Sequence, residues 1–352
     1  MHDAPQHEIC VHRERRIKEY VMPTHAPKKE MPAMMSIKTS DPESSAAIFN
    51  GYHRKKMSAV RVTKIRDFDV TPPRKSAFQI ETPPDVPRQH SLTIFSARRG
   101  GGKSVACTTY VKKLLDVGAM QRVIIITPTW ASNKDIFAPL NIKEEDVIEP
   151  SKTALATVVS RVEQEKKEHE EYLAKKRKYK EFQKAMRSAT CIEAIPMSLM
   201  VEALDAGFFE GPPKWKHADD THPTFCMLII DDCLSLPMMM NPSSGLVNTC
   251  IKHRHVADGL GLSIAMLVQT YCAVGGLPRP IRENCTLLCL FKLKDQNQLK
   301  KIHEEIGSDV DLDRFDKLFE YATSKPYGFL AIDFNPKSPD QTFRCCFNEC
   351  LA

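Results

Sequence analysis

The sequence predicts an α/β fold in which a mainly parallel β-sheet is flanked by helices. Three short segments carry this prediction, namely SLTIFSA from residue 91, RVIIITPT from residue 122 and FCMLIIDD from residue 225. Each is apolar at successive positions, which is typical of strands that are covered on both faces. Helical or charged stretches separate the segments, and strands that alternate with helices favour a parallel sheet.

The other elements are predicted in chain order from the same signals. SLTIFSA leads through a glycine-rich turn into a helix along KSVACTTYVKKLLDVG, which we expect to end at Gly118. NPSSGLVNTCIKHRH and DQNQLKKIHEEIGS are predicted to be helices. GLSIAMLVQT, TLLCLFKLK and YGFLAIDF are predicted to be further strands.

Outside this core, the composition of the chain changes. Residues 1–60 are rich in Pro, Met, His and charge and show no sustained period, which predicts a largely disordered N-terminal arm. Residues 61–90 combine short β-like runs with two proline pairs, and we expect a small β lead-in there. The core domain is predicted to span 91–340, and 341–352 to form a C-terminal tail.

A charged segment at 155–189 interrupts the alternation of strands and helices. It contains RVEQEKKEHEEYLAKKRKYKEFQKAMR, with sparse apolar positions, an acidic first half and a basic second half. The segment is predicted to be a long helical insertion. Two interpretations remain open, a solvated helix held by ion pairs between residues four apart, or a lever or DNA-facing arm. Residues 205–224 are predicted to form a loop.

The overall composition sets few limits on function. The chain has 352 residues, a hydrophobic fraction of 42% and a net charge of +6, which permits a polyanionic partner without requiring one. No apolar run is long enough to span a membrane and the N-terminus does not resemble a secretory signal, so we expect a soluble cytosolic protein. The 12 cysteines include no Cys-x-x-Cys pair, and we expect reduced thiols rather than a zinc site.

The strongest local signal is ARRGGGKS, which starts at residue 97 and fits the P-loop pattern with Ala in place of the first Gly. Glycines let backbone N–H groups curl around phosphate oxygens, and the helix that follows favours an anion at its N-terminus. A lysine in this position reaches the β- and γ-phosphates of ATP, and the next hydroxyl is a magnesium ligand. The predicted ATP-binding residues are Ala97, Arg98, Arg99, Gly100, Gly101, Gly102, Lys103, Ser104 and Val105.

The second half of the predicted site is the end of FCMLIIDD, a strand that ends in acid as a Walker B strand does. We expect Asp231 to hold Mg²⁺ together with Ser104, and Asp232 to act as the base that orients or activates the attacking water. The usual base is the longer Glu, and the alternative is that the pair only caps the strand end. Gln269, at the end of the next predicted strand, is expected to sense the γ-phosphate, unless it is only a capping amide.

Other classes of P-loop protein fit less well. A GTPase needs Asn-Lys-x-Asp, whereas this chain has Asn133-Lys134-Asp135, which is one residue short and too early in the chain. A small-molecule kinase is usually smaller and carries an arginine-rich lid. A helicase-like enzyme or a kinase remains the alternative, and a non-catalytic scaffold is disfavoured because the lysine, the serine and the paired aspartates are intact.

The stretch 251–292 resembles the DNA-packaging ATPases of large eukaryotic DNA viruses, the poxvirus type, within the FtsK–HerA superfamily. The resemblance covers about 88–335 and includes the Thr127-Pro128-Thr129 run with Asn133 behind it. The residues of 251–292 that carry it are His253-Arg254-His255, Gln269, Tyr271, Pro278, Ile281-Arg282-Glu283-Asn284 and Phe291-Lys292.

The resemblance implies a RecA-like motor that assembles as a homo-oligomeric ring and drives double-stranded DNA into a preformed capsid. It implies contact with DNA that is not sequence-specific, capsid or membrane-associated virion proteins as partners, and a location in the host cytoplasm, a viral factory or the virion. Such motors often complete one subunit's site with an arginine from the next. Arg282, with Arg254 as second choice, is the candidate, and the alternative for each is a surface cation or a structural ion pair.

Overall fold

The structure, a computed structural model, describes residues 78, 80–233, 245–272, 276–293, 296–306 and 310–351. By its internal contacts the chain divides into two units, Met1–Thr71 and Pro72–Ala352, and all described residues belong to the second. The predicted N-terminal arm and most of the predicted β lead-in lie outside the described residues. The described part of that lead-in, 80–90, consists of turns and bends and contains no strand.

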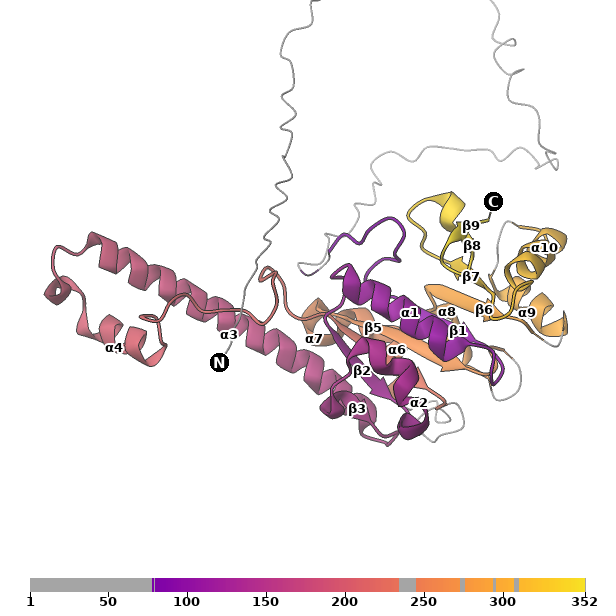
Figure 1. Ribbon diagram of the computed structural model, residues 1–352, viewed down its shortest axis with the longest axis horizontal. Helices are drawn as coiled ribbons and strands as arrows, with labels where there is room; N and C mark the ends of the chain where they lie inside the picture. Colours follow the sequence, from indigo (N-terminus) through magenta and orange to yellow (C-terminus); the bar gives the residue numbers. More distant parts are fainter. Residues whose placement is uncertain are drawn as a thin grey trace, which may run out of the picture. The chain divides into compact units, whose positions relative to one another are not determined.

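One mixed sheet runs through the described part of the chain (Figure 1). Its spatial order is β3-β2-β4-β5-β1-β6-β7-β8-β9. The strands from β3 to β6 in this order are parallel, and β7, β8 and β9 continue the sheet in antiparallel fashion. The strand bounds are β1 (Leu92–Ser96), β2 (Arg122–Ile126), β3 (Val147–Ile148), β4 (Cys226–Asp231), β5 (Leu262–Val268), β6 (Leu287–Phe291), β7 (Phe329–Asp333), β8 (Phe343–Cys345) and β9 (Glu349–Cys350).

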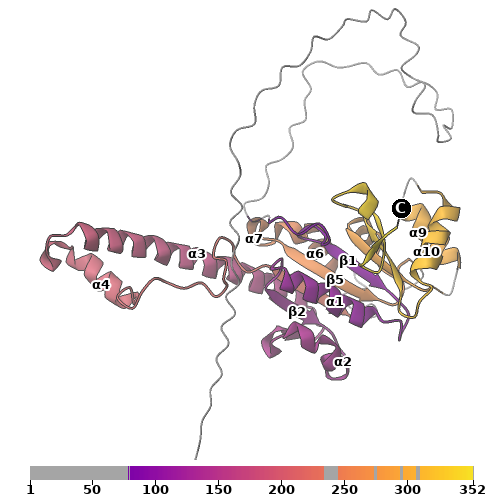
Figure 2. The same cartoon turned by 45° about the horizontal axis from the view of Figure 1, so that its top comes forward.

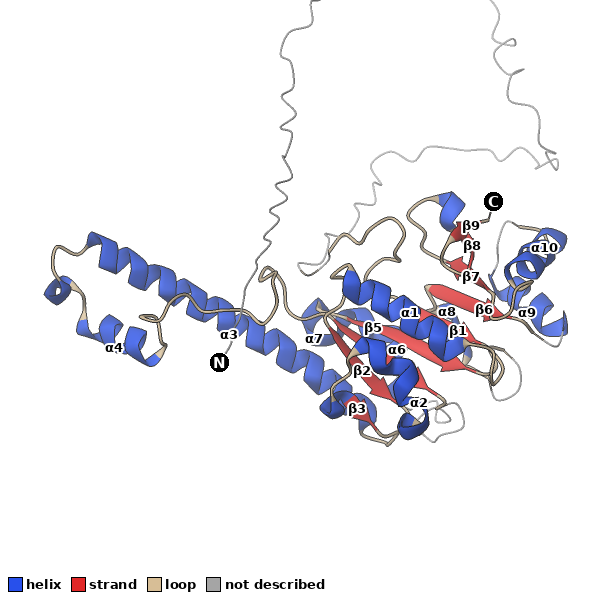
Figure 3. Cartoon of the chain, in the orientation of Figure 1, coloured by secondary structure: helices blue, strands red, loops and turns tan. Residues whose placement is uncertain are grey.

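Helices flank this sheet (Figure 3). They are α1 (Lys103–Asp116), α2 (Trp130–Phe137), α3 (Ala154–Ser188), α4 (Met197–Asp205), α6 (Gly245–Lys252), α7 (Val256–Gly259), α8 (Arg279–Glu283), α9 (Gln296–Ile306) and α10 (Leu312–Ala322). Within the described residues, no helix is both long enough and apolar enough to cross a membrane.

The predicted fold class is confirmed. Every residue of β1, β4, β5, β6 and β7 is buried, as expected for apolar strands covered on both faces. β5 lies between β1 and β4, with Ser96 opposite Val268 and Asp231 opposite Leu267. The carboxyl ends of these three strands therefore meet at one edge of the sheet, where ligands of open α/β folds bind.

The structure differs from the sequence-based prediction in one boundary and in several helices. The predicted tail at 341–352 is wrong as a tail, because β8 and β9 add it to the sheet beside β7. Backbone pairing with a neighbouring strand, which sequence periodicity does not report, orders this segment. The helices α2, α4, α7, α8 and α10 were also not predicted. α10 shows the clearest start, since Asp311 caps it by accepting a hydrogen bond from the Arg314 N–H at 2.8 Å.

The predicted helical insertion is α3, a single helix of 35 residues. Its first part is not solvated, because Leu155, Val158 and Val162 are buried in the main core. Its distal part pairs with α4, away from the sheet, around a small separate core of Phe182, Ala203 and Phe208 (Figures 1 and 2).

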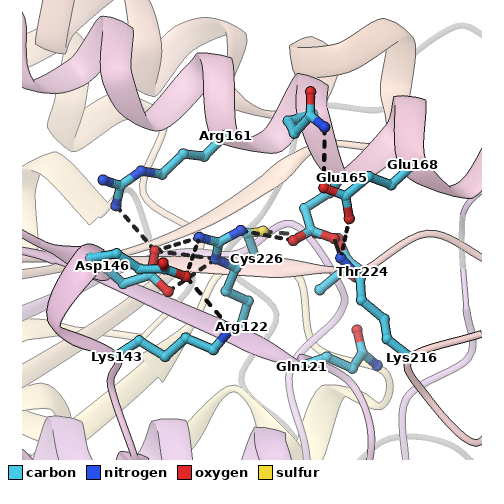
Figure 4. Close-up of polar contacts among 12 residues, drawn as sticks. Gln121, Arg122, Lys143, Asp146, Arg161, Glu165, Glu168, Lys216, Thr224 and Cys226 are labelled. Atoms are coloured by element: carbon cyan, nitrogen blue, oxygen red, sulfur yellow. Dashed lines mark hydrogen bonds and ion pairs between the residues drawn. The ribbon is translucent and has the colours of Figure 1, made fainter.

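A buried ionic network fastens the first part of α3 to the sheet (Figure 4). The Arg122 guanidinium, at the start of β2, donates to Asp146 at 2.7 Å and to Glu165 of α3 at 2.8 Å. Arg161 donates to Asp146 at 3.0 Å, and Lys216 contacts Glu165. The ion pairs in this part of α3 therefore run mainly to the sheet and its loops rather than between residues four apart.

Candidate nucleotide site

The loop between β1 and α1 has the backbone that its glycines allow. Gly100 and Gly102 adopt left-handed φ angles of 74° and 94°. A Cβ on Gly101 would lie 3.0 Å from the Arg98 carbonyl oxygen and 3.1 Å from the Ala97 Cβ. Only glycine satisfies these positions without strain, so the loop holds the curled form that presents its N–H groups to an anion.

Lys103 begins α1, directly after the loop. Its residue is 8% exposed, and its ammonium lies 3.7 Å from the Asp232 carboxylate. A lysine at the N-terminus of a 14-residue helix adds its charge to the positive end of the helix dipole. Ser104 follows Lys103 in α1, and both residues line the cavity that is described below. The structure thus places Lys103 and Ser104 at the first turn of α1, directly after the glycine loop.

Asp231, the last residue of β4, is 1% exposed. One of its oxygens accepts a hydrogen bond from the Asn133 amide of α2 at 3.1 Å. Its other oxygen is buried and has no hydrogen-bond partner. Burial, together with the neighbouring Asp232, raises the pKa of the Asp231 carboxyl above its usual value, although Lys103 and Asn133 act in the opposite direction.

This orphaned oxygen is an observation that fits a divalent cation. Buried polar atoms in folded proteins nearly always have a partner, and a carboxylate oxygen is the ligand that Mg²⁺ prefers. The donor set that the sequence predicted, Asp231 with the Ser104 hydroxyl, is suitable for that ion. Elsewhere, and at this site too, the described residues contain no group of three or more His, Cys, Asp or Glu side chains that could hold a metal, so the set for Mg²⁺ rests on Asp231 and the Ser104 hydroxyl.

Asp232 follows the strand with a left-handed φ of 51°, which is uncommon for a residue other than glycine. Strained backbone of this kind costs about 1–3 kcal/mol and is concentrated at functional sites. The conformation leaves the side chain 33% exposed at the cavity, between two donors. The Lys103 ammonium lies at 3.7 Å, and the Gln269 amide, directly after β5, donates at 3.4 Å.

The cavity at this edge of the sheet has a volume of about 890 Å³, within the usual range for ligand sites. Its wall includes the glycine loop with Lys103, Asp232 and Gln269. The wall also includes residues that the sequence analysis did not identify. They are Tyr327, Phe329, Cys346, Phe347 and Asn348, which come from β7, the turn before it, and the turn between β8 and β9.

Tyr327 touches the glycine loop itself. It has a left-handed φ of 64°, and its side chain is 72% exposed. A Cβ on Gly102 would lie 3.0 Å from the Tyr327 Cδ1. The third glycine of the loop therefore serves two purposes, its own backbone conformation and the close approach of this ring. The only sequence signal was a tyrosine followed by glycine before the last predicted strand, which is not specific.

Two of the predicted ATP-binding residues, Ala97 and Arg98, do not line the cavity. Ala97 is buried and its N–H donates to the Val268 carbonyl at 3.0 Å, so this N–H serves the junction with β5. Arg98 is exposed and does not line the cavity, whereas Arg99 and Val105 do.

Arg282 is engaged within its own chain. Its guanidinium makes two hydrogen bonds to the Glu305 carboxylate, at 2.9 and 2.7 Å, and lies 5.7 Å from the centre of the Tyr271 ring. The side chain is 14% exposed. A two-point pair of this kind orients both partners, so the geometry favours the structural ion pair among the two interpretations of Arg282.

Arg254 lies at the opposite edge of the sheet from Lys103. It belongs to the 3-10 turn His253–His255, and the His253 ring contacts the carbonyl of Leu262, the first residue of β5, at 3.0 Å. Arg254 is exposed. Within one chain, the structure does not bring Arg254 to the cavity, so a role in catalysis requires a second copy.

No protein-family model and no curated protein sequence matches the chain. Solved structures with a similar fold include the genome packaging NTPase B204 from Sulfolobus turreted icosahedral virus 2 in complex with sulfate, at 14% identity and a TM-score of 0.39 over 72% of this chain and 94% of that chain. B204, the DNA-packaging ATPase from Sulfolobus turreted icosahedral virus, has the same identity and TM-score over 73% of this chain and 96% of that chain. EssC (ATPases 2 and 3) from Geobacillus thermodenitrificans is 13% identical with a TM-score of 0.38, over 70% and 38%. At these values the function of this chain is inferred from its own side chains.

Proposed function

We propose that the chain is an ATPase. One observation supports this most directly. Lys103 from the start of α1 and Asp231, Asp232 and Gln269 from the ends of β4 and β5 converge beside the glycine loop that precedes α1. A lysine and a helix N-terminus bind the phosphates, while the two acids supply a metal ligand and a base. This division of roles is what phosphoryl transfer to water requires.

Each residue then has a task in the reaction. Mg²⁺, when bound by Asp231 and Ser104, would neutralise charge on the phosphates. Lys103 binds the β- and γ-phosphates and stabilises the charge that develops as the terminal group leaves. Asp232 accepts a proton from the attacking water, and Gln269 holds the Asp232 carboxylate in place by its amide N–H.

The aromatic part of the cavity wall is suited to the nucleotide base. Tyr327, Phe329 and Phe347 offer apolar ring surface, and Asn348 offers hydrogen-bonding groups for the base edge. Bases stack on aromatic rings with about 1–3 kcal/mol each. We infer that the C-terminal strands and turns form the base subsite.

We further propose that hydrolysis moves double-stranded DNA into a viral capsid. The support is the ordered resemblance of 251–292 to poxvirus-type packaging ATPases, carried by residues such as His253, Gln269 and Ile281. On this proposal the chain forms a homo-oligomeric ring, contacts DNA without reading its sequence, and docks on capsid or membrane-associated virion proteins. The alternative, a helicase-like enzyme or a kinase, keeps the same nucleotide site.

The proposal is tested by ATP turnover with and without long duplex DNA. We expect turnover that duplex stimulates, and a loss of at least about 100-fold in the Lys103→Ala variant, because the Lys103 ammonium at the start of α1 is the charge placed to bridge the β- and γ-phosphates. Lys112→Ala is the matched control, since Lys112 lies on the same helix and pairs with Asp116 at the surface. Equal turnover in the two variants would refute the site, and unwinding or phosphorylation of a small acceptor would favour the alternative.

A ring with shared sites predicts that turnover rises with protein concentration. An arginine from a neighbouring copy would leave nucleotide binding intact when replaced but would slow hydrolysis. Mixing Arg254→Ala or Arg282→Ala with Lys103→Ala should then restore part of the activity, because one subunit supplies the loop and the other the arginine. No recovery in either mixture, alongside full activity of a monomer, would exclude a shared site.

A further inference from the structure

A second cavity lies at the amino ends of the parallel strands, opposite the nucleotide cavity. Its volume is about 540 Å³, and its wall includes Ser91 directly before β1 and Thr286 directly before β6. The amino ends of the parallel strands meet here, whereas the nucleotide cavity lies at their carboxyl ends. The sequence-based prediction assigned no ligand to this place.

Two exposed arginines, Arg88 and Arg254, line this cavity. Among the described residues neither lies in a direct ion pair, and Arg88 acts only electrostatically on Asp333 in the same wall. The one acid in the wall, Asp333, is already paired with Arg344 at 3.1 Å, and both of those side chains are 6% exposed. The cavity therefore carries an excess of positive charge.

Two buried nitrogen atoms in the same wall also have no partner. Gln89 accepts a hydrogen bond from the Ile80 N–H at 2.9 Å through its oxygen, which leaves its Nε2 as an unused donor. The Nε2 of His90 is likewise buried and unpaired. Buried polar atoms without partners are rare in folded proteins, and such atoms beside two exposed guanidinium groups are consistent with an anion site.

The backbone of His90 is strained in this wall. His90 has a left-handed φ of 59°, and a Cβ on Gly261 would lie only 2.3 Å from its Nδ1. Burial, reinforced by the nearby Arg254, lowers the pKa of His90 to about 4. The ring is therefore neutral at pH 7, and it can offer one N–H without being repelled further by the two arginines.

We propose that this cavity binds a phosphate oxyanion, and that the oxyanion is a backbone phosphate of duplex DNA. This inference rests on the proposed DNA-translocating function. Arg88 and Arg254 are exposed and can reach a polymer outside the cavity, while the donors of Gln89 and His90 complete the site beneath. Such a contact is independent of base sequence, because phosphates carry no sequence information.

The test is the binding of a fluorescent 40-base-pair duplex, followed by anisotropy without nucleotide between about 50 and 200 mM salt. We expect Arg88→Gln to weaken binding about 10-fold and to reduce the slope of log affinity against log salt by about 1. Arg88→Lys should retain most of the affinity because it keeps the charge. Arg279→Gln is the matched control, since Arg279 is an exposed arginine already paired with Glu283 at 2.8 Å, and it should bind as the wild type does.

The outcomes separate this inference from the function on which it rests. Wild-type protein without affinity for duplex would refute the proposed function and this contact with it. Wild-type affinity that Arg88→Gln leaves unchanged would refute the contact alone. If Arg88→Gln binds duplex normally but loses the rise of ATP turnover with protein concentration, the oxyanion is a nucleotide phosphate in a neighbouring copy, and the DNA assignment is wrong.

Discussion

Replacing Arg122 by methionine should destabilise the protein, because the guanidinium lies between two buried carboxylates. Asp146 is 1% exposed and Glu165 is 3% exposed, and Arg122 donates to both (Figure 4). Removing one partner of a buried ion pair costs about 3–5 kcal/mol, since a charge is left uncompensated in a poorly solvated place. Methionine keeps the apolar stem of the side chain, so the variant isolates the loss of charge and hydrogen bonds.

The magnitude is expected at the lower end of that range. Asp146 keeps Arg161 at 3.0 Å, and Glu165 keeps Lys216, so neither acid becomes isolated. About 3 kcal/mol in a domain of this size corresponds to a fall in melting temperature of about 6–12 °C. Lys143→Ala is the control from the same neighbourhood. Its pair with Glu145 at 3.5 Å is mostly exposed and should contribute less than about 1 kcal/mol.

The difference between wild type and Arg122→Met should depend on pH. Burial alone would raise the pKa of Glu165, but hydrogen bonds from Lys216 and Thr224 and the pair with Arg122 outweigh it and lower the pKa below its usual value. A lowered pKa contributes stability above the unfolded value, and that stability is lost as pH falls through the folded value. The difference in melting temperature between wild type and Arg122→Met should therefore become smaller below about pH 4. Equal melting temperatures for Arg122→Met and Lys143→Ala at pH 7 would refute the reasoning.

Three variants test the nucleotide cavity. Asp232→Asn should bind ATP but hydrolyse it at least about 100-fold more slowly, because Asp231 still binds the metal while the base is lost. If ATP binding, measured with a fluorescent nucleotide, falls as much as hydrolysis does, the roles of the two acids are exchanged. Tyr327→Ala should raise the KM for ATP about 5–100-fold with little change in kcat, whereas Tyr327→Phe should behave as wild type. A fall in kcat without a change in KM would exclude Tyr327 as a residue that binds the nucleotide base. Gly102→Ala should lower the free energy of unfolding by about 1–2 kcal/mol and weaken ATP binding. The left-handed φ of 94° disfavours any Cβ, and the Tyr327 ring occupies the space that this Cβ would need. An unchanged melting temperature and KM would argue against the close approach of Tyr327 to Gly102.

The sequence was sufficient for those parts of the site that depend on short spacings. The glycines before Lys103 and the acids that end β4 lie in contiguous segments, so their roles could be predicted without knowledge of the fold. The position of Gln269 followed from the end of an apolar strand. These residues are brought together because parallel strands share one carboxyl edge.

Residues that reach the site through tertiary structure could not be predicted in the same way. Tyr327 comes from a turn more than two hundred residues after the loop that it touches. Asn133 was considered mainly as part of a failed GTPase pattern, yet its amide holds Asp231. The partner of Arg282 is Glu305, on a separate helix, and no spacing in the sequence indicates that pair.

The length of α3 has a mechanical consequence. A helix of 35 residues extends for about 52 Å at 1.5 Å per residue. The buried charges hold α3 near the start of β2 through Arg161 and Glu165, so a reorientation of that strand would tilt the helix about these residues. Glu165 lies 23 residues before the last residue of α3, and a tilt of about 10° there displaces the far end by about 6 Å. The far end carries α4, whose Met197, Val201 and Leu204 side chains are exposed to solvent, so the largest displacement falls on apolar groups that are free to meet another surface.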